Sequence, residues 1–497
     1  MNVKESLELA DFYDSQIDAH HDPGEIRTLR ERRNADCSQT RRLPPEILTK
    51  IFSILGTFNY EGQYTHLKWM AVTHVCRTWR DNALNEPTLW TDFTDIHPKW
   101  VREAFTRSKA APLRLRYGYD ECSSDALDFV VDALVKSPER IRELQVVDYD
   151  GSFIDRLTQP TPFLEFLAVE LGAPMTFPPS FLGGVAPRLR SVRCSGPLPL
   201  EAGWLTNVRS LEYNGSLDSR AHLLTKLTSL KLERGATHGM SIATLLSALE
   251  SSPSLECLLI VAASDMDTVS RPHRSTPLHL HHLRDITFDL GSKSRMAKIF
   301  RYLRVDDIEK LCTSWSYNFQ NVTMLEHVCH FFNTCYHGDD LRYVVYDMSR
   351  GLELYTRSVD EAGPSLLFRL YAWADPSKIV KLLPRCVPRI LLTRLRPDMK
   401  ALALSECDTI EELRISSGHL HHHFCINGTS LPYPSLRQLH FGERVVGLDS
   451  EQLYQLVTWL APRQPRVEVF VREGRIPAKA VEALRETSLL RLIYSEL

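Results

Sequence analysis

Residues 41–55 read Arg-Arg-Leu-Pro-Pro-Glu-Ile-Leu-Thr-Lys-Ile-Phe-Ser-Ile-Leu, and they predict a helix that begins at a pair of prolines. Pro44 and Pro45 suit a first helical turn, because a backbone nitrogen there has no partner within the helix and proline's fixed φ is already helical. Glu46 complements the positive end of the helix dipole. The apolar residues that follow recur at the spacing of one helical face; they are Ile47, Leu48, Ile51, Phe52 and Leu55.

Residues 75–90 repeat this pattern and read Val-Cys-Arg-Thr-Trp-Arg-Asp-Asn-Ala-Leu-Asn-Glu-Pro-Thr-Leu-Trp. Apolar side chains recur at helical spacing from Val72 to Ala83, and Asn85-Glu86-Pro87 ends the run. Two or three short amphipathic helices are therefore expected. A segment this short cannot bury every apolar face within itself, because small domains hide too little of their surface. Part of the apolar face is expected to need a partner.

The order of these elements resembles the F-box family, in particular F-box-like proteins of the fungal type. The resemblance covers about fifty of the 497 residues. Its motif residues are Leu43, Pro44, Glu46, Val75, Cys76, Trp79, Leu89 and Trp90. The resemblance implies three helices that dock on the Skp-type adaptor of a cullin-RING (SCF-type) ubiquitin ligase. One departure is the link from Gly56 to His66, which is longer than the usual link between the first two helices.

The adaptor-binding surface that the resemblance implies combines the apolar face of the first helix with the second half of the motif. Trp79 is expected to fill a pocket beside that face. The candidate adaptor-binding residues are Leu43, Pro44, Glu46, Ile47, Leu48, Ile51, Phe52, Leu55, Val72, Val75, Cys76 and Trp79.

The composition, 43% hydrophobic and 24% charged residues, is ordinary for a globular protein, and the length allows about two to four domains. A formal net charge of -3 gives no global attraction to nucleic acid or to an anionic membrane. The eleven cysteines stand mostly in apolar contexts, as reduced thiols do. With neither a secretion signal nor a membrane span in the sequence, a cytoplasmic or nuclear location is expected.

The chain is expected to contain three parts. Residues 1–40 form a polar, arginine-rich lead-in that is partly disordered or helical, and its interspersed acidic residues favour a solvated face over a nucleic-acid site. Residues 41–117 form the F-box domain with a following packing segment, which contains Trp100, Phe105 and a strand at Leu113–Tyr117. Residues 118–497 form a leucine-rich-repeat-like domain for substrate binding. The expected fold class is α+β, with a three-helix F-box followed by an irregular α/β solenoid.

The third part is inferred from a short pattern, apolar-x-x-apolar-x-apolar, that returns along the chain. Its best copies begin 19 to 28 residues apart at Ile141, Leu164, Leu189, Val208, Leu227, Leu255 and Leu283. Weaker copies begin at Ile308, Leu341, Ile410 and Leu436, while a match that begins at Met399 lies too close to its neighbour to be a separate repeat. Helical patterns lie at residues 125–136, 241–250, 295–303, 324–336, 451–460 and 477–490.

A strand and a return repeated at this period resemble leucine-rich repeats, in which each unit buries its apolar face on the next. The Asn or Cys that such repeats place after the strand is mostly absent. An ordinary α/β domain with similar strands is the alternative.

Stacked repeats would align the residue between the last two apolar positions of each copy, because side chains alternate along a strand. This predicts an outward-facing column. Its members are Gln145, Ala168, Arg193, Glu212, Lys231, Leu259, Thr287, Cys312, Val345, Arg414 and His440. Arg193, Glu212 and Lys231 offer alternating charge and are the candidate substrate-binding residues, with a solvated sheet face as the alternative.

Motifs for phosphate binding, an exposed nucleophile or a metal pair, such as Gly-x-x-x-x-Gly-Lys, Gly-x-Ser-x-Gly and His-Glu-x-x-His, do not occur in the sequence. Asp148-x-Asp150 follows a strand copy and is interpreted as the start of a turn. The histidine clusters at residues 279–282 and 419–423 lack the spacing of a closed zinc site, so solvated loop histidines are expected. No catalytic residue, cofactor or metal site is predicted.

The favoured hypothesis is a non-catalytic F-box substrate receptor, which binds a Skp-type adaptor through its N-terminal helices and an unknown protein substrate through its repeats. An F-box scaffold without a degradative role, and an uncharacterised enzyme in residues 118–497, remain as alternatives. Neither a membrane nor a nucleic-acid partner is expected.

Overall fold

The computed structural model of the chain combines helices and strands, so its fold class is α+β. The structure describes residues 3–37, 43–57, 68–93, 98–117, 125–149, 151, 153–172, 176–215, 225–238, 240–261, 276–289, 299–314, 322–337, 341–347, 351–355, 366–371, 381–383, 386–394, 407–419, 433–446, 460, 467–472 and 490–493. The chain divides into two compact units, Met1–Leu189 and Arg190–Leu497, and each is described by itself.

Unit 1 begins with an antiparallel pair of helices, α1 (Val3–Ala19) and α2 (Pro23–Cys37), which the turn at His20–Asp22 separates. Tyr13 Oη donates a hydrogen bond of 2.6 Å to Asp36 Oδ2, and Arg33 Nη2 lies 2.8 Å from Asp14 Oδ2. The described part of the lead-in is thus helical, and polar contacts join its two helices.

Four helical segments follow, and they form a small apolar core. They are α3 (Pro45–Thr57), a 3-10 helix (Lys68–His74), α4 (Arg77–Asn85) and a second 3-10 helix (Pro87–Trp90). The Trp69 and Trp90 rings meet edge to face, with their centroids 4.9 Å apart. Trp90 Nε1 donates a hydrogen bond of 3.1 Å to the backbone oxygen of Ala83. The closing Leu-Trp of the motif is therefore part of the core, since Leu89 and Trp90 are both buried.

The predicted packing segment is α5 (Pro98–Arg107), and Arg107 joins it to the preceding core. The Arg107 guanidinium donates to the backbone oxygen of Leu84 over 2.9 Å and lies 5.2 Å from the Trp90 ring centroid. Val101 and Ala104 are buried, whereas Trp100 is exposed. The segment therefore packs through its small aliphatic side chains and Arg107.

Unit 1 also contains the first parallel strands of the chain. They are β1 (Asp92–Phe93), β2 (Leu113–Tyr117), β3 (Ile141–Asp148) and β4 (Phe166–Leu171), and each pairs with the next in parallel. Between β2 and β3 lies α6 (Asp125–Lys136), at the bounds that the sequence predicted.

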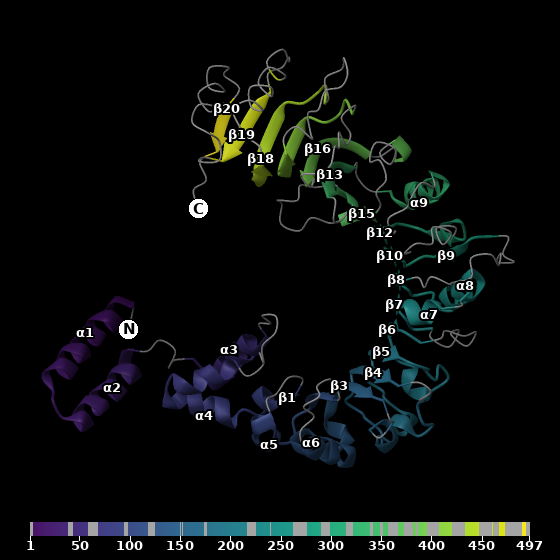
Figure 1. Ribbon diagram of the computed structural model, residues 1–497. Coiled ribbons are helices and arrows are strands. Elements are labelled where there is room, and N and C mark those ends of the chain that lie inside the picture. Colours follow the sequence, from purple (N-terminus) through teal and green to yellow (C-terminus); the bar gives the residue numbers. More distant parts are fainter. Residues whose placement is uncertain are drawn as a thin grey trace. The chain divides into compact units, whose positions relative to one another are not determined.

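Unit 2 contains a ladder of parallel strands that follow one another in chain order (Figure 1). The strands are β5 (Ser191–Ser195), β6 (Ser210–Tyr213), β7 (Ser229–Leu232), β8 (Cys257–Val261), β10 (Asp285–Asp289) and β12 (Lys310–Ser314). Each contains the last two apolar residues of one copy, and the first apolar residue of that copy lies two positions before the strand. The ladder confirms these copies as strands, while the leucine-rich-repeat interpretation stays a prediction.

The chain departs from this regular order after β12, because β13 (Leu341–Asp347), β14 (Gly351–Tyr355) and β15 (Leu366–Tyr371) form an antiparallel meander. β15, not β13, pairs with β12. The predicted alignment of Val345 directly beside Cys312 is therefore wrong, because Cys312 lies opposite Arg369. β13 instead pairs with β16 (Cys386–Arg394).

Parallel pairing then resumes through the last strands of the chain. β16 is followed by β17 (Glu412–His419), β18 (Gln438–Val446), β19 (Glu468–Arg472) and β20 (Leu490–Ile493). The copies at Ile410 and Leu436 are strands as predicted. The match at Met399 lies outside the described residues.

The α-helices described in unit 2 are α7 (Arg234–Thr237), α8 (Ile242–Glu250) and α9 (Val322–Cys335), and a 3-10 helix lies at Gly203–Leu205. Ser241 caps α8 by accepting a hydrogen bond of 3.1 Å from the Thr244 backbone nitrogen. The helices predicted at residues 241–250 and 324–336 are confirmed within two residues.

The helix predicted at residues 295–303 is wrong at its end, because Leu303 begins β11 (Leu303–Val305), which pairs with β9 (Leu278–Leu280). Most of the helices predicted at residues 451–460 and 477–490 lies outside the described residues. No helix in the described ranges is both long and apolar enough to cross a bilayer.

Candidate functional site

Helix α3 carries apolar side chains on two adjacent faces, and only one of them is buried in unit 1. Leu48 and Phe52 are 1% and 0% exposed, and the Phe52 ring lies 5.2 Å from the Trp79 ring between centroids. A helix that is apolar over so wide an arc is normally covered on both sides. The sequence predicted one continuous face, and the structure divides it into a core face and an exposed face.

The exposed face of α3 consists of Ile47, Ile51, Ile54 and Leu55, at positions i, i+4, i+7 and i+8 of one helical stripe. They are 45%, 38%, 48% and 41% exposed, respectively. Val75, before α4, is 59% exposed. Large aliphatic side chains gathered on one short helix form the kind of apolar patch that marks an interaction site. We call Ile47, Ile51, Ile54 and Leu55 the α3 patch.

The other residues of the Val-Cys-x-x-Trp motif stabilise α4 and its contact with α3, and they do not extend the patch. Cys76 caps α4, because its Sγ accepts a hydrogen bond of 3.5 Å from the Trp79 backbone nitrogen. Trp79 is half-buried against Phe52. Arg77, in the first turn of α4, forms an ion pair with Glu31 of α2, with Nη2 2.9 Å from Oε1.

The structure thus separates the twelve predicted adaptor-binding residues into surface and interior positions. Leu48, Phe52 and Val72 are buried in the core, so a partner could reach them only if the domain opened. Leu43, Cys76 and Trp79 are half-buried, and Pro44 and Glu46 are exposed at the start of α3. The prediction missed Ile54, which helical spacing from Ile47 and Ile51 could have identified.

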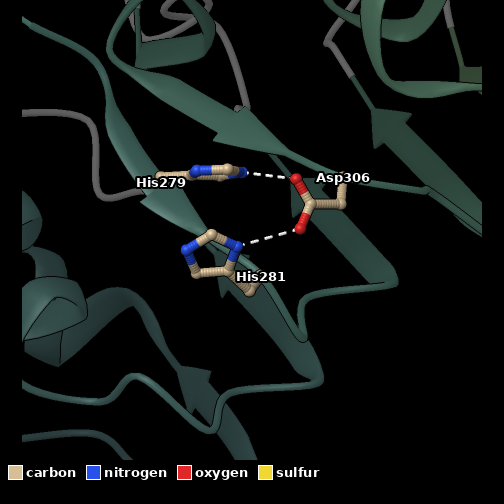
Figure 2. Close-up of side chains that lie close together, drawn as sticks. All are labelled: His279, His281 and Asp306. Atoms are coloured by element: carbon tan, nitrogen blue, oxygen red, sulfur yellow. Dashed lines mark hydrogen bonds and ion pairs between the residues drawn. The ribbon is translucent and has the colours of Figure 1, made fainter.

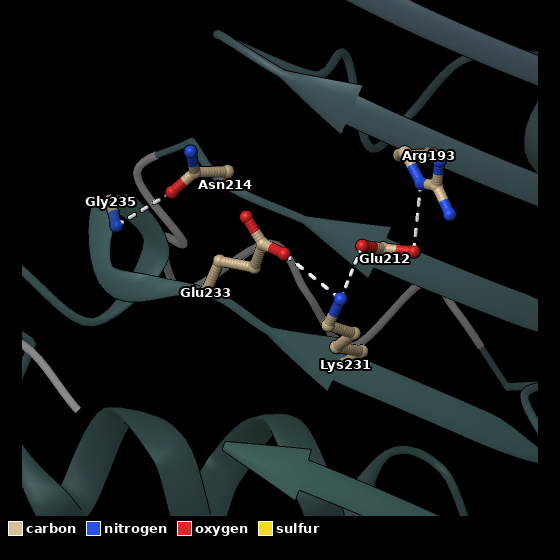
Figure 3. Close-up of polar contacts among 6 residues, drawn as sticks. All are labelled: Arg193, Glu212, Asn214, Lys231, Glu233 and Gly235. Atoms are coloured by element: carbon tan, nitrogen blue, oxygen red, sulfur yellow. Dashed lines mark hydrogen bonds and ion pairs between the residues drawn. The ribbon is translucent and has the colours of Figure 1, made fainter. Parts of the chain in front are cut away.

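The candidate substrate residues Arg193, Glu212 and Lys231 lie side by side on β5, β6 and β7, in the register that the sequence predicted. Arg193 Nε lies 2.8 Å from Glu212 Oε2, and Lys231 Nζ lies 2.5 Å from Glu212 Oε1 (Figure 3). Lys231 Nζ also lies 3.0 Å from Glu233 Oε1. Glu233 therefore belongs to the same cluster, although the prediction did not include it. We call these four residues the charged row.

Hydrogen bonds within the charged row favour the ionised forms of Glu212 and Lys231. Partial burial raises the pKa of Glu212. The hydrogen bonds from Lys231 and Arg193 lower this pKa by more than burial raises it, so the net shift is downward. Partial burial lowers the pKa of Lys231, but the hydrogen bonds to Glu212 and Glu233 raise it to a greater extent. The negative charge of Glu212 is thereby balanced by its two cationic neighbours. The Arg193 side chain remains 56% exposed and is the most accessible charged group of the row.

A side-chain hydrogen bond fixes the turn beside the charged row. Asn214 follows β6, and its Oδ1 accepts a hydrogen bond of 2.7 Å from the Gly235 backbone nitrogen, after β7 (Figure 3). A Cβ at Gly235 would lie 2.5 Å from that oxygen, so the contact requires glycine. Asn214 therefore satisfies a turning backbone after the strand, as the asparagine of a leucine-rich repeat is expected to do.

The rest of the predicted column is less uniform. Register continues from Lys231 to Leu259 and Thr287 and then to Cys312. Cys312 and Ala168 keep their places in this register but are 6% and 1% exposed, so the prediction that the column is open to solvent is wrong at these two positions. Farther along unit 2, Arg414 lies opposite His440, and Glu412 lies 2.6 Å from Arg414 Nε and 3.2 Å from His440 Nε2.

Two sequence motifs with other predicted roles are also described. Asp148 is buried, and its Oδ2 accepts hydrogen bonds of 3.1 and 2.8 Å from the Phe153 and Ile154 backbone nitrogens, which confirms a turn. His279 lies in β9 instead of a loop, and both it and His281 contact Asp306 (Figure 2). Residues 420–423 of the second histidine cluster lie outside the described residues.

A comparison with protein families agrees with the motif at the start of the chain. A family model described as F-box-like matches residues 40–95. No curated protein matches the chain. The matched range contains α3, α4, both 3-10 helices of the small core and the whole α3 patch. The chain is therefore a protein with an F-box-like domain at residues 40–95.

Proposed function

We propose that this chain is a non-catalytic F-box substrate receptor, which joins a target protein to a Skp-type adaptor of an SCF-type ubiquitin ligase. F-box domains typically bind Skp-type adaptors, and the chain carries an F-box-like domain. The observation that carries the proposal is the α3 patch, which is exposed although its side chains are as apolar as those in the core. An adaptor that covered the patch would remove this apolar surface from water.

The adaptor contact in this proposal uses the α3 patch, with Pro44 and Glu46 at its edge. Leu48, Phe52 and Val72 contribute indirectly, because they hold α3 against α4. This division refines the predicted site, since the interior residues shape the surface and the exposed residues touch the partner. Interface energy usually concentrates in a few apolar anchors near the centre of such a surface.

The adaptor contact can be tested by co-purifying the chain with a Skp-type adaptor and measuring their affinity. Changing Ile51 and Ile54 together to alanine should weaken binding by about 2 kcal/mol or more, roughly thirtyfold, because both would be buried anchors. Val185→Ala is the matched control, since Val185 is 52% exposed in unit 1 but lies outside the F-box-like domain. If the folded double variant binds the adaptor as tightly as wild type, the proposal fails.

The target protein in this proposal binds unit 2 at the charged row. The charged side chains of the row are already paired with one another. A target must therefore offer complementary charged groups in the same order, so that ion pairs with the target replace ion pairs within the row. Such pairing gives specificity more than affinity. The scaffold alternative keeps the adaptor contact and predicts unchanged turnover of every bound protein. The level of a captured protein in cells with and without this chain separates the two.

A further inference from the structure

Three side chains of the kind that bind transition metals converge on one face of the β9–β11 pair. The strands pair in parallel, with His279 opposite Arg304. Alternate residues face the interior, because Leu278, Leu280, Leu303 and Val305 are all buried. His279, His281 and Asp306 fall between or beyond these positions and share the opposite face (Figure 2).

The ligand atoms of these side chains are close enough to share one ion. His279 Nε2 lies 2.5 Å from Asp306 Oδ1, and His281 Nδ1 lies 2.9 Å from Asp306 Oδ2. All three ligand atoms lie within 4.8 Å of one another. Two ligands of a tetrahedral zinc ion are about 3.3 Å apart, because each is about 2.0 Å from the metal. An ion could enter after the side chains move apart by about 1 Å.

The surroundings favour a metal ligand set over three unrelated surface groups. The side chains of His279, His281 and Asp306 are 32%, 62% and 51% exposed, which leaves the face open to an ion. The strands beneath are fixed by their buried residues and by a hydrogen bond of 2.7 Å from the Leu278 nitrogen to the Tyr302 oxygen.

We propose that His279, His281 and Asp306 bind one divalent zinc ion. Two imidazoles and one carboxylate are a ligand set that zinc accepts, and three protein ligands leave a coordination position for water. The site is independent of the α3 patch and of the charged row. The sequence did not indicate it, because the histidine cluster supplies only two ligands and the third comes 25 residues after His281.

Zinc binding to the full chain tests the site, with stoichiometry measured by elemental analysis and affinity by competition with a chromophoric chelator. His279→Ala and Asp306→Asn should each remove one zinc ion per chain or weaken its binding by more than about 100-fold. Loss of a direct ligand should exceed the 10- to 100-fold effect typical of an outer-shell residue. Both positions are on the surface, and circular dichroism checks that the variants fold.

His282→Ala is the matched control, because His282 is an exposed neighbour of the same cluster and is not one of the three ligands. This variant should keep the zinc stoichiometry and affinity of wild type. Residues 419–423 contain further histidines that are unchanged in every variant, so the test compares variants and the expected result is a difference of one ion. Equal zinc binding by wild type, His279→Ala and Asp306→Asn would overturn the proposal. An equal loss in His282→Ala would also overturn it.

Discussion

Ile51 and Phe52 are neighbours in the sequence, yet the structure gives them opposite environments. Ile51 is 38% exposed, whereas Phe52 is 0% exposed and contacts Trp79. Periodicity identified both as part of an apolar arc, but it could not tell which side of the arc faces the domain. That choice depends on where α4 packs, and the position of α4 is a tertiary property. The sequence therefore predicted the apolar residues of the site better than their individual roles.

This difference predicts unequal effects on stability. Phe52→Ala should lower the free energy of unfolding by about 3–5 kcal/mol, because it leaves a cavity beside Trp79. Ile51→Ala should change it by about 0.5 kcal/mol or less, since exposed substitutions are usually nearly neutral. Urea denaturation monitored by tryptophan fluorescence measures both values. Equal losses in the two variants would contradict the assignment of Phe52 to the core and Ile51 to the surface.

Glu212 predicts a dependence of stability on pH. Its pKa is lowered from an ordinary value of 4.5, so its ionised form stabilises the fold. This stabilisation is fully present above the ordinary pKa and is lost as the pH falls through the lower pKa of the folded state. The difference in unfolding free energy between wild type and Glu212→Gln should therefore be constant above about pH 5 and shrink in more acidic solution. A difference that stayed constant down to about pH 3 would show that the ion pairs do not stabilise the row.

The strands of unit 2 were predictable as elements because each must bury its own apolar side chains. The pattern located β5 to β8, β10 and β12 without reference to tertiary structure. It did not reveal that β14 and β15 intervene between β12 and β13. The local apolar pattern is the same for parallel and antiparallel neighbours, so it indicates a strand without indicating its partner. The predicted order of the column is therefore wrong where it depended on which strands pair.

Asn214 offers a test of how consecutive strands of the ladder are connected. Asn214→Ala should lower the free energy of unfolding by about 1 kcal/mol or more, because the Gly235 N–H would lose its acceptor. Asn214→Asp is the matched control, since its carboxylate oxygen can accept the same hydrogen bond. Thermal or urea denaturation of both variants measures the effect. If alanine and aspartate destabilise the chain equally, the side-chain acceptor does not hold the turn.

At the scale of the whole molecule, the two proposed surfaces belong to different compact units. The α3 patch lies within Met1–Leu189, and the charged row lies within Arg190–Leu497. The proposed receptor function would raise the effective concentration of a target near a ligase, and the two surfaces can be weakened separately because they share no residue. The apolar motif of the first surface and the strands of the second could be predicted because each is a local pattern, whereas the predicted boundary after residue 117 differs from the division between the compact units at Leu189. The third ligand of the proposed zinc site could not be predicted, because it depends on the pairing of β9 with β11.

The last prediction separates the two surfaces in one chain. Changing Arg193 and Lys231 together to glutamate places three acidic side chains on adjacent strands, because Glu212 lies between them. Like charges directly opposite one another repel, and a target complementary to the original row would lose its partners. Capture of target proteins should fall by about tenfold or more, the loss that 1.4 kcal/mol of binding energy represents, while affinity for the Skp-type adaptor stays unchanged.

Arg209→Glu is the control for this charge reversal, because Arg209 is exposed just before β6 and lies outside the charged row. Quantitative mass spectrometry of proteins co-purified with each chain measures capture, and the bound adaptor serves as the internal standard. Circular dichroism shows whether the reversed chain still folds. Undiminished capture by a folded chain would move the target-binding site away from β5, β6 and β7. A parallel loss of adaptor would instead mean that the two surfaces do not act separately.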